Sequence, residues 1–157
     1  SSLSLSKNYV FNFNEYLYDY GNDFSEFNTI INKYKKTDIS FSPNIIVNNS
    51  IVWAFKKPFS VSLKSKFVGK QYLDNTSDSK RSIDPFLLND FELNVNLNNN
   101  FLKNLYFKFL INNIFNEVYS NNGYTFGYYG GLNYEVRENY YYPQAVRNYM
   151  LTINFKI

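Results

Sequence analysis

The chain of 157 residues contains no cysteine and no histidine. Without cysteine it can form no disulfide and supplies no thiolate nucleophile or metal ligand. Without histidine it lacks the other common zinc ligand and the central member of a Ser-His-Asp triad. These absences disfavour most enzyme classes, and we expect neither a cofactor nor covalent catalysis.

Long hydrophobic runs and clusters of basic residues are lacking as well. The longest apolar run, Ile51 to Phe55, has five residues, whereas a membrane helix needs about 18. The 16 Lys and Arg residues are scattered and the net charge is only +3, so we expect no nucleic-acid partner. The opening residues SSLSLSKN have neither an initiator Met nor the features of a signal peptide, and we expect the chain to begin within a longer protein.

Aromatic residues are abundant: 16 Tyr, 16 Phe and 1 Trp make up 21% of the chain. Such a composition is not that of a disordered protein. Apolar and polar residues alternate with period two, which is typical of strands with two unlike faces. Six segments show this alternation: Leu3 to Phe11, Ile45 to Phe55, Phe59 to Val68, Leu87 to Leu97, Leu105 to Asn112 and Asn148 to Ile157.

A soluble antiparallel sheet with one buried face has the same pattern, but the connections favour a different architecture. Long connections (residues 13–43, 69–85 and 116–146) alternate strictly with short ones (Lys56-Lys57-Pro58 and Asn98-Asn99-Asn100). Outer-membrane barrels have this layout, with short periplasmic turns and long outer loops. The predicted fold is therefore all-β, an antiparallel transmembrane β-barrel segment of about six strands.

Aromatic residues on the apolar face are predicted to gather at the two ends of the strands, as the interfacial girdles of such barrels do. Those near the short turns are Trp53, Phe55, Phe59 and Phe155, and those near the long loops are Tyr9, Phe11, Phe67 and Tyr149. The opposite face is predicted to be a polar wall of Lys64, Lys66, Glu92, Asn94, Asn96, Lys108 and Asn154. Gly69 and Gly123 are predicted to adopt positive φ in turns.

Six strands are too few to close a membrane barrel, which needs about eight. Each open edge would leave on the order of ten backbone groups in hydrocarbon, at several kcal/mol apiece. We therefore expect residues 1–157 to be the C-terminal part of a larger barrel, completed by further strands or by other chains.

Four stretches together resemble the C-terminal barrel portion of TonB-dependent outer-membrane receptors. They are TDISFSPNIIVNN (Thr37 to Asn49), FVGKQYLDNT (Phe67 to Thr76), INNIFNEVY (Ile111 to Tyr119) and YYPQAVRNYMLTINFKI (Tyr141 to Ile157). The last stretch resembles the assembly signal of outer-membrane proteins, although that signal usually ends in an aromatic residue and this chain ends in Ile157. The family's plug domain and energy-coupling box have no counterpart in this sequence.

The resemblance implies a location in the outer membrane of a Gram-negative cell and active uptake of a nutrient, such as a siderophore, cobalamin, an oligosaccharide or a peptide. The partners that it implies are outer-membrane lipid, the TonB energy-coupling complex acting through the missing N-terminal region, the remaining barrel strands and plug, and the insertion machinery. Two alternatives stay open, a soluble carbohydrate-binding β-sandwich and a structural or pore-forming barrel without a plug.

Ligand contacts are expected in the long loops, because loops on a rigid scaffold generally carry binding. The last connection is the richest, since tyrosines offer flat apolar faces with a hydroxyl and arginine binds carboxylate or phosphate in a fork. The candidates are Tyr124, Tyr128, Tyr129, Tyr134, Arg137, Tyr140 and Tyr141. Packing of this loop against neighbouring loops is the favoured interpretation of these tyrosines. A glycosidase pair (Glu135 and Glu138) and a metal site (Asp19, Asp23 and Glu26) are disfavoured by a flexible-loop setting and by spacing.

Overall fold

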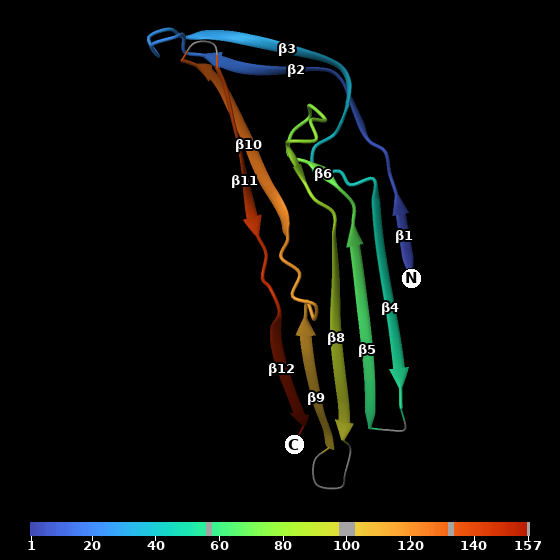
Figure 1. Cartoon of the computed structure of the whole chain (residues 1–157). Coiled ribbons are helices and arrows are strands. Elements are labelled where there is room, and N and C mark those ends of the chain that lie inside the picture. Colours follow the sequence, from blue (N-terminus) through green and yellow to red (C-terminus); the bar gives the residue numbers. More distant parts are fainter. Residues whose placement is uncertain (56–57, 98–102, 132–133, 157) are drawn as a thin grey trace.

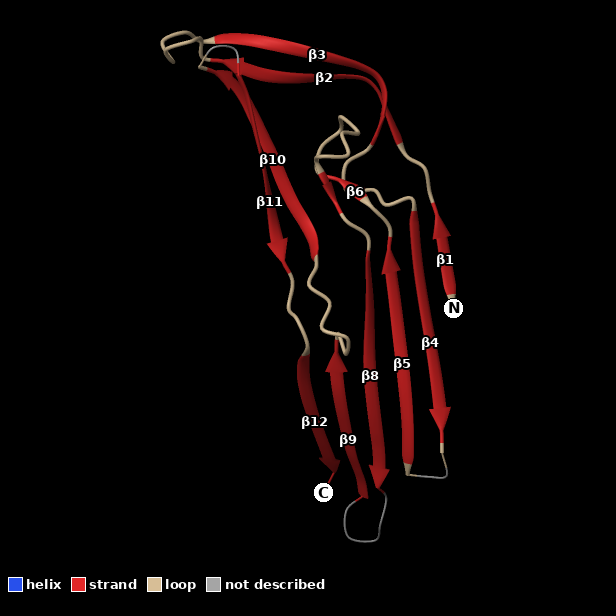
Figure 2. Cartoon of the chain, in the orientation of Figure 1, coloured by secondary structure: helices blue, strands red, loops and turns tan. Residues whose placement is uncertain are grey.

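A computed structural model describes residues 1–55, 58–97, 103–131 and 134–156 of the chain. All regular structure in these ranges is β-strand (Figures 1 and 2). Accordingly, the described residues include no helix that is long and apolar enough to span a membrane. The predicted all-β class is confirmed.

The main element is a sheet of six strands in the order β1-β4-β5-β8-β9-β12. Every neighbouring pair is antiparallel. The strands are β1 (Ser2–Leu5), β4 (Ile45–Ala54), β5 (Phe59–Val68), β8 (Phe86–Leu97), β9 (Lys103–Asn112) and β12 (Asn148–Lys156). They correspond to the six alternating segments, so the prediction that these segments form strands with antiparallel pairing is confirmed.

The first segment differs from the prediction, because it is interrupted after Leu5. Ser6 still donates its N–H to the carbonyl of Asn44, the next residue in the β1–β4 register, and its hydroxyl donates to the carbonyl of Pro43. The Asn8 side chain bonds to Ser42 (2.8 Å). The polar stretch from residue 6 to residue 8 therefore redirects the chain, and Tyr9 and Phe11 belong to the next strand instead of the six-stranded sheet.

The long connections were predicted as loops, and this prediction is wrong. The first contains β2 (Tyr9–Asp19) and β3 (Asn28–Asp38), the second β6 (Gln71–Tyr72) and β7 (Ser82–Ile83), and the third β10 (Ser120–Gly130) and β11 (Tyr134–Pro143). A second sheet, in the order β11-β10-β2-β3, joins the two long hairpins. Figure 1 shows β2 and β3 crossing above the end of the main sheet to meet β10. The short turns at 56–57 and 98–100 lie outside the described residues.

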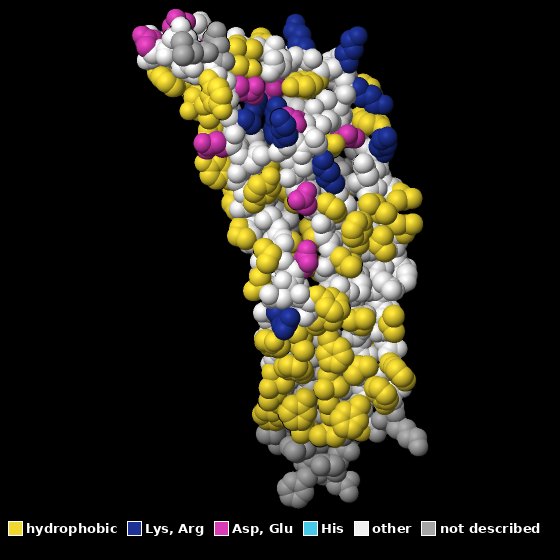
Figure 3. Space-filling view, viewed as in Figure 1, with side chains coloured by type: hydrophobic (Ala, Val, Ile, Leu, Met, Phe, Trp, Pro, Cys, Tyr) yellow, Lys and Arg dark blue, Asp and Glu magenta, His cyan; other side chains and the backbone are white. Residues whose placement is uncertain are grey.

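The register of the six-stranded sheet separates its side chains into an apolar and a polar face. Leu63 lies opposite Ile51 and Phe91, and Phe109 opposite Leu93 and Leu151. This apolar face is exposed: Trp53 is 65% accessible, Leu151 61% and Phe155 63%. In the space-filling view hydrophobic side chains dominate the lower part of the molecule, while charged ones gather near the top (Figure 3).

Burial in the six-stranded sheet is opposite to that of a water-soluble domain. Polar side chains such as Glu92 and Ser62 are buried there, whereas large apolar side chains are exposed. The buried apolar residues lie at the upper end of the sheet or above it: Leu17, Val68, Leu73, Ile83 and Phe86. No second layer of the described chain covers the apolar face.

The six-stranded sheet is open in the described part of the chain. β1 pairs only with β4 and β12 only with β9, so these two strands form the edges of the sheet. The sheet is therefore not closed into a barrel.

The roles predicted for two glycines are corrected. Positive φ occurs at Gly21 and Gly131, and not at Gly69 or Gly123. Gly123 instead allows a close approach, because a Cβ there would lie 2.4 Å from the carbonyl oxygen of Tyr140 and 3.0 Å from Leu73.

Candidate functional site

The seven candidate residues of the last connection lie on one β-hairpin, formed by β10 and β11. Cross-strand pairing places Tyr124 opposite Tyr140 and Gly127 opposite Arg137. Because successive residues of a strand point to opposite faces, the candidates divide into two groups. Tyr124, Tyr128, Tyr134 and Tyr140 share one face, and Tyr129, Arg137 and Tyr141 share the other. The structure does not bring all seven together.

The face with Tyr124 carries a row of stacked rings. The Tyr124 and Tyr140 ring centroids are 5.0 Å apart at an interplanar angle of 12°, and Phe126 stacks on Tyr140 at 6.0 Å and 10°. The Tyr140 hydroxyl donates a hydrogen bond to Glu138, which raises the pKa of Tyr140. Tyr124 and Tyr140 are both more than 40% exposed, so this face is an accessible aromatic surface.

The opposite face of the hairpin contacts the second long connection. The Asn139 amide donates to the carbonyl of Lys80 (2.8 Å), and the Tyr141 hydroxyl donates to that of Ser82 (3.1 Å). Tyr141 therefore has a structural contact.

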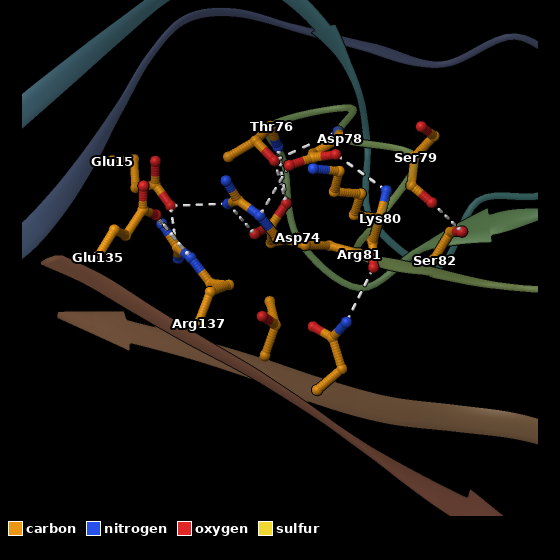
Figure 4. Close-up of polar contacts among 12 residues, drawn as sticks. Glu15, Asp74, Thr76, Asp78, Ser79, Lys80, Arg81, Ser82, Glu135 and Arg137 are labelled. Carbon is orange, nitrogen blue, oxygen red and sulfur yellow. Dashed lines mark hydrogen bonds and ion pairs between the residues drawn. The ribbon is translucent and has the colours of Figure 1, made fainter.

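A charged cluster connects all three long connections; we call it the junction cluster, and its members are Glu15, Asp74, Asp78, Arg81, Glu135 and Arg137 (Figure 4). One carboxylate oxygen of Glu15 accepts from Arg81 (2.8 Å) and Arg137 (2.9 Å). Its other oxygen accepts from Asn32 (3.2 Å) and Tyr34 (3.1 Å). Glu15 on β2 thus holds an arginine from each of the other two connections.

Arg81 is the most buried cation of the junction cluster, with a side chain that is 9% exposed. It also pairs with Asp74 (2.8 Å) and Asp78 (3.3 Å). Burial, the largest single effect, lowers the pKa of Arg81, but the hydrogen bonds and charges of Asp74 and Glu15 outweigh it and raise the pKa above its ordinary value. Arg81 is therefore a permanent cation that neutralises acids from two connections.

Arg137 reaches Glu15 by crossing β10 at Gly127. A Cβ on Gly127 would lie 2.6 Å from Nε of Arg137, so that only glycine leaves room for this side chain. Arg137 also binds Glu135 (2.7 Å), and its hydrogen bond lowers the pKa of Glu135. The sequence predicted Arg137 as a lone cation for a ligand, whereas its guanidinium already binds two carboxylates.

A cleft of about 750 Å³ opens between β2 and β10, beside the junction cluster. The two strands are parallel and pair only at Tyr18 with Tyr128 and at Asp19 with Tyr129. Toward their N-terminal ends the two strands separate, and Asp74 and Thr76 also line the cleft between them. Of the seven sequence candidates, only Tyr128 and Arg137 line the cleft.

The sequence pattern did not indicate that β2 contributes to this cleft. Its lining residues include Asn14, Tyr16 and Tyr18. Residues 13–43 are predicted as a single connection, because aromatic residues lie on both faces of β2 and lysines on both faces of β3, so that their alternation is less clear than that of the six chosen segments. In β2, Glu15 and Leu17 are buried while Tyr16 and Tyr18 are exposed. The Gly21-Asn22-Asp23 stretch between β2 and β3 is a turn signal that could have revealed the hairpin.

The other acidic candidates have local partners. Glu135 and Glu138 lie on a strand and not in a flexible loop, and they point to opposite faces of it, so that they cannot flank one glycosidic bond. Asp19 accepts from the Gly21 N–H and Asp23 from that of Ser25. The described residues contain no group of three acids placed to hold a metal ion.

The polar face of the six-stranded sheet carries the charges that the alternation placed there. Glu92 binds Lys64 (2.9 Å) and Lys108 (3.0 Å), one on each neighbouring strand. Tyr106 donates to Asn94 on the same face. Glu92 is thus paired with both lysines, which leaves the group a net charge of two minus one, or +1, and no residue of this wall is singled out as a ligand contact.

No family model matches the chain, and neither a curated protein nor a solved structure matches it.

Proposed function

We propose that the chain forms part of the wall and outer rim of an outer-membrane β-barrel of the TonB-dependent receptor type, which takes up a scarce nutrient. The observation that carries the proposal is the broad, exposed apolar face of the six-stranded sheet, which one row of polar residues, Asn49, Ser65 and Asn89, crosses in its upper half. Apolar area exposed to water costs about 25 cal/mol per Å², so a face of this extent needs an apolar environment. Hydrocarbon supplies that environment if the backbone groups at the sheet edges are paired.

The layout of the strands supports a barrel wall over a soluble sandwich. All three long connections leave the same end of the sheet, and all apolar burial lies at that end or beyond it. A sandwich would cover its apolar face with a second sheet. The four-stranded sheet of the described residues does not cover this face. The polar face, with its network of Lys64, Glu92 and Lys108, suits a water-filled or plug-filled interior.

Within this proposal the open strands β1 and β12 pair with further strands, and a plug and an energy-coupling partner belong to other parts of the receptor. The chain itself contributes wall, rim and assembly signal, and it performs no covalent chemistry. By itself it transports nothing, so substrate flux through vesicles that contain only this chain would contradict the proposal.

The proposal is tested by locating the chain in a Gram-negative host. The 157 residues are fused to a secretory leader, and the cells are separated into soluble and outer-membrane fractions. The account predicts that the chain sediments with outer membrane and resists alkaline extraction. Recovery as a monodisperse soluble protein without detergent would contradict it and favour the sandwich, whereas steady ion conductance in planar bilayers would favour the barrel without a plug.

A further inference from the structure

The walls of the cleft between β2 and β10 are strand edges, not strand faces. Residues 13–18 of β2 and residues 125–128 of β10 line it without a gap. Since successive side chains point to opposite faces of a strand, a wall that includes every residue exposes the backbone itself. The cleft is therefore bounded by main chain on both sides.

On β2 the edge that faces the cleft carries backbone groups without a partner strand in the described part of the chain. β2 pairs with β10 at Tyr18 and Asp19, and the Tyr20 N–H donates to the Tyr129 carbonyl (2.9 Å), so Tyr18 directs its backbone groups toward β10. Alternate residues of a strand direct these groups the same way. By this alternation Asn14 and Tyr16 turn their N–H and C=O groups to the cleft, and Glu15 and Leu17 turn theirs to β3, with which this stretch is in continuous register.

The opposite wall has the same property. Tyr129 of β10 bonds toward β2, so by the same alternation Thr125 turns its N–H and C=O groups to the cleft. On its other side β10 is paired with β11. Thr125 has no strand partner toward β2 in the ranges that the structure describes, because the pairing of β10 with β2 begins only at Tyr128.

We propose that this cleft binds an extended peptide, which enters as an additional strand between β2 and β10. Strand addition satisfies main-chain groups along an open edge, and the side chains beside it give selectivity. A strand rises about 3.3 Å per residue, so the stretch from Asn14 to Leu17 accommodates roughly four peptide residues. Tyr16, Tyr18 and Phe126 beside the cleft offer aromatic contacts to the side chains of the peptide.

The charges nearby indicate which peptides are preferred. The junction cluster contains four carboxylates (Glu15, Asp74, Asp78 and Glu135) and two guanidiniums (Arg81 and Arg137), which gives two minus four, a net charge of −2. Neutral or lysine-containing peptides are therefore favoured over acidic ones. The inference goes beyond the proposed function, because binding at this edge does not depend on the surroundings of the six-stranded sheet.

The test uses the full chain in detergent micelles and a fluorescein-labelled peptide of alternating Thr and Val with one Lys. Its matched control is the same peptide with alternate backbone nitrogens methylated, which keeps the side chains but cannot complete the ladder. Fluorescence polarisation is expected to show binding of the first peptide and at least about tenfold weaker binding of the second, equivalent to the loss of about 1.4 kcal/mol. Equal binding of both peptides, or binding of neither, overturns the proposal.

A variant of the chain provides a second test. Tyr16→Pro removes an N–H that faces the cleft and leaves the bonds to β3 in place. At this residue β2 is paired on one side only, so proline is tolerated there as it is on an edge strand. Tyr16→Ala removes the ring but retains the N–H. We expect Tyr16→Pro to lose the preference for the unmethylated peptide and Tyr16→Ala to keep it. If both variants keep the preference, the peptide binds elsewhere and the proposal is wrong. Because micelles replace the membrane, these results do not depend on where the chain resides in a cell.

Discussion

Below its upper end the six-stranded sheet exposes large apolar side chains and buries polar ones such as Glu92, whereas above the sheet charged side chains are buried among ion-pair partners. Leu151 of the sheet is 61% exposed, while Glu15 of β2 is 9% exposed and accepts hydrogen bonds from two arginines. Both regions consist of strands with alternating side chains. What differs is the kind of side chain that faces outward, since the sheet exposes apolar residues and the hairpins above it are joined by ion pairs.

This difference predicts that the two regions respond to different substitutions. Changes in the junction cluster should loosen the hairpins and leave the six-stranded sheet intact. Changes on the apolar face should impair membrane association and leave the junction cluster intact.

The largest effect is expected for Arg81→Ala. Removing a buried cation leaves Asp74 and Asp78 without their partner and Glu15 with one arginine instead of two, which costs about 3 to 5 kcal/mol. Hydrogen exchange should show faster exchange of β2, β3, β10 and β11, with β5 and β8 unchanged. Lys80→Ala, at an exposed neighbour that forms no ion pair in the described structure, is the control. Equal effects of the two variants would show that the junction cluster does not hold the hairpins.

The next effect concerns the apolar face. Leu151→Arg places a charge on the face proposed to meet lipid, and a cation at mid-membrane costs about 2 to 4 kcal/mol. Thr152→Arg adds the same charge on the polar face and should cost much less. The measurement is the equilibrium of folding into lipid vesicles at increasing urea concentration. A similar loss of folding free energy in both variants would contradict the claim that one face of the sheet meets lipid and the other does not.

A smaller effect is expected for Gly127→Ala. The new Cβ would lie 2.6 Å from Nε of Arg137, so the arginine must move away from Glu15 at a cost of about 1 to 3 kcal/mol. Limited proteolysis should then cut the β10–β11 hairpin faster. In the double variant with Arg137→Ala the clash is absent, and the two effects should not add. Additive effects would mean that the methyl group destabilises the hairpin through a contact other than that with Arg137.

The smallest effect is a pH dependence at Glu135. Its hydrogen bond with Arg137 lowers the pKa below the ordinary value of 4.5, so the carboxylate stabilises the hairpin above that pH, and the contribution disappears as the pH falls through the lowered pKa. The side chain is 39% exposed, which limits the effect to about 1 kcal/mol or less. Urea unfolding followed by tyrosine fluorescence should show a smaller acid-induced loss in Glu135→Gln than in the parent chain. Identical profiles would contradict this assignment.

The six-stranded sheet could be predicted from the sequence because apolar and polar residues alternate along most of each of its strands. The register from Leu63 to Phe91 and Ile111 follows from that pattern, because a shift by one residue would reverse the faces. The hairpins escaped detection since β2 and β3 mix charges and aromatics on both faces. Contacts such as that of Glu15 with Arg81 join residues far apart in the chain, and the one-dimensional pattern carries no signal for them.

The central claim, that the apolar face of the six-stranded sheet meets lipid, is tested most directly by fluorescence quenching. The chain has no cysteine, so Leu151→Cys and Thr152→Cys each introduce a single site for an environment-sensitive dye on opposite faces of β12. The chain is folded into vesicles whose lipid tails carry a quencher. The account predicts strong quenching at position 151 and little at position 152. Equal quenching at the two positions, or a chain that stays in solution with neither dye quenched, would contradict it.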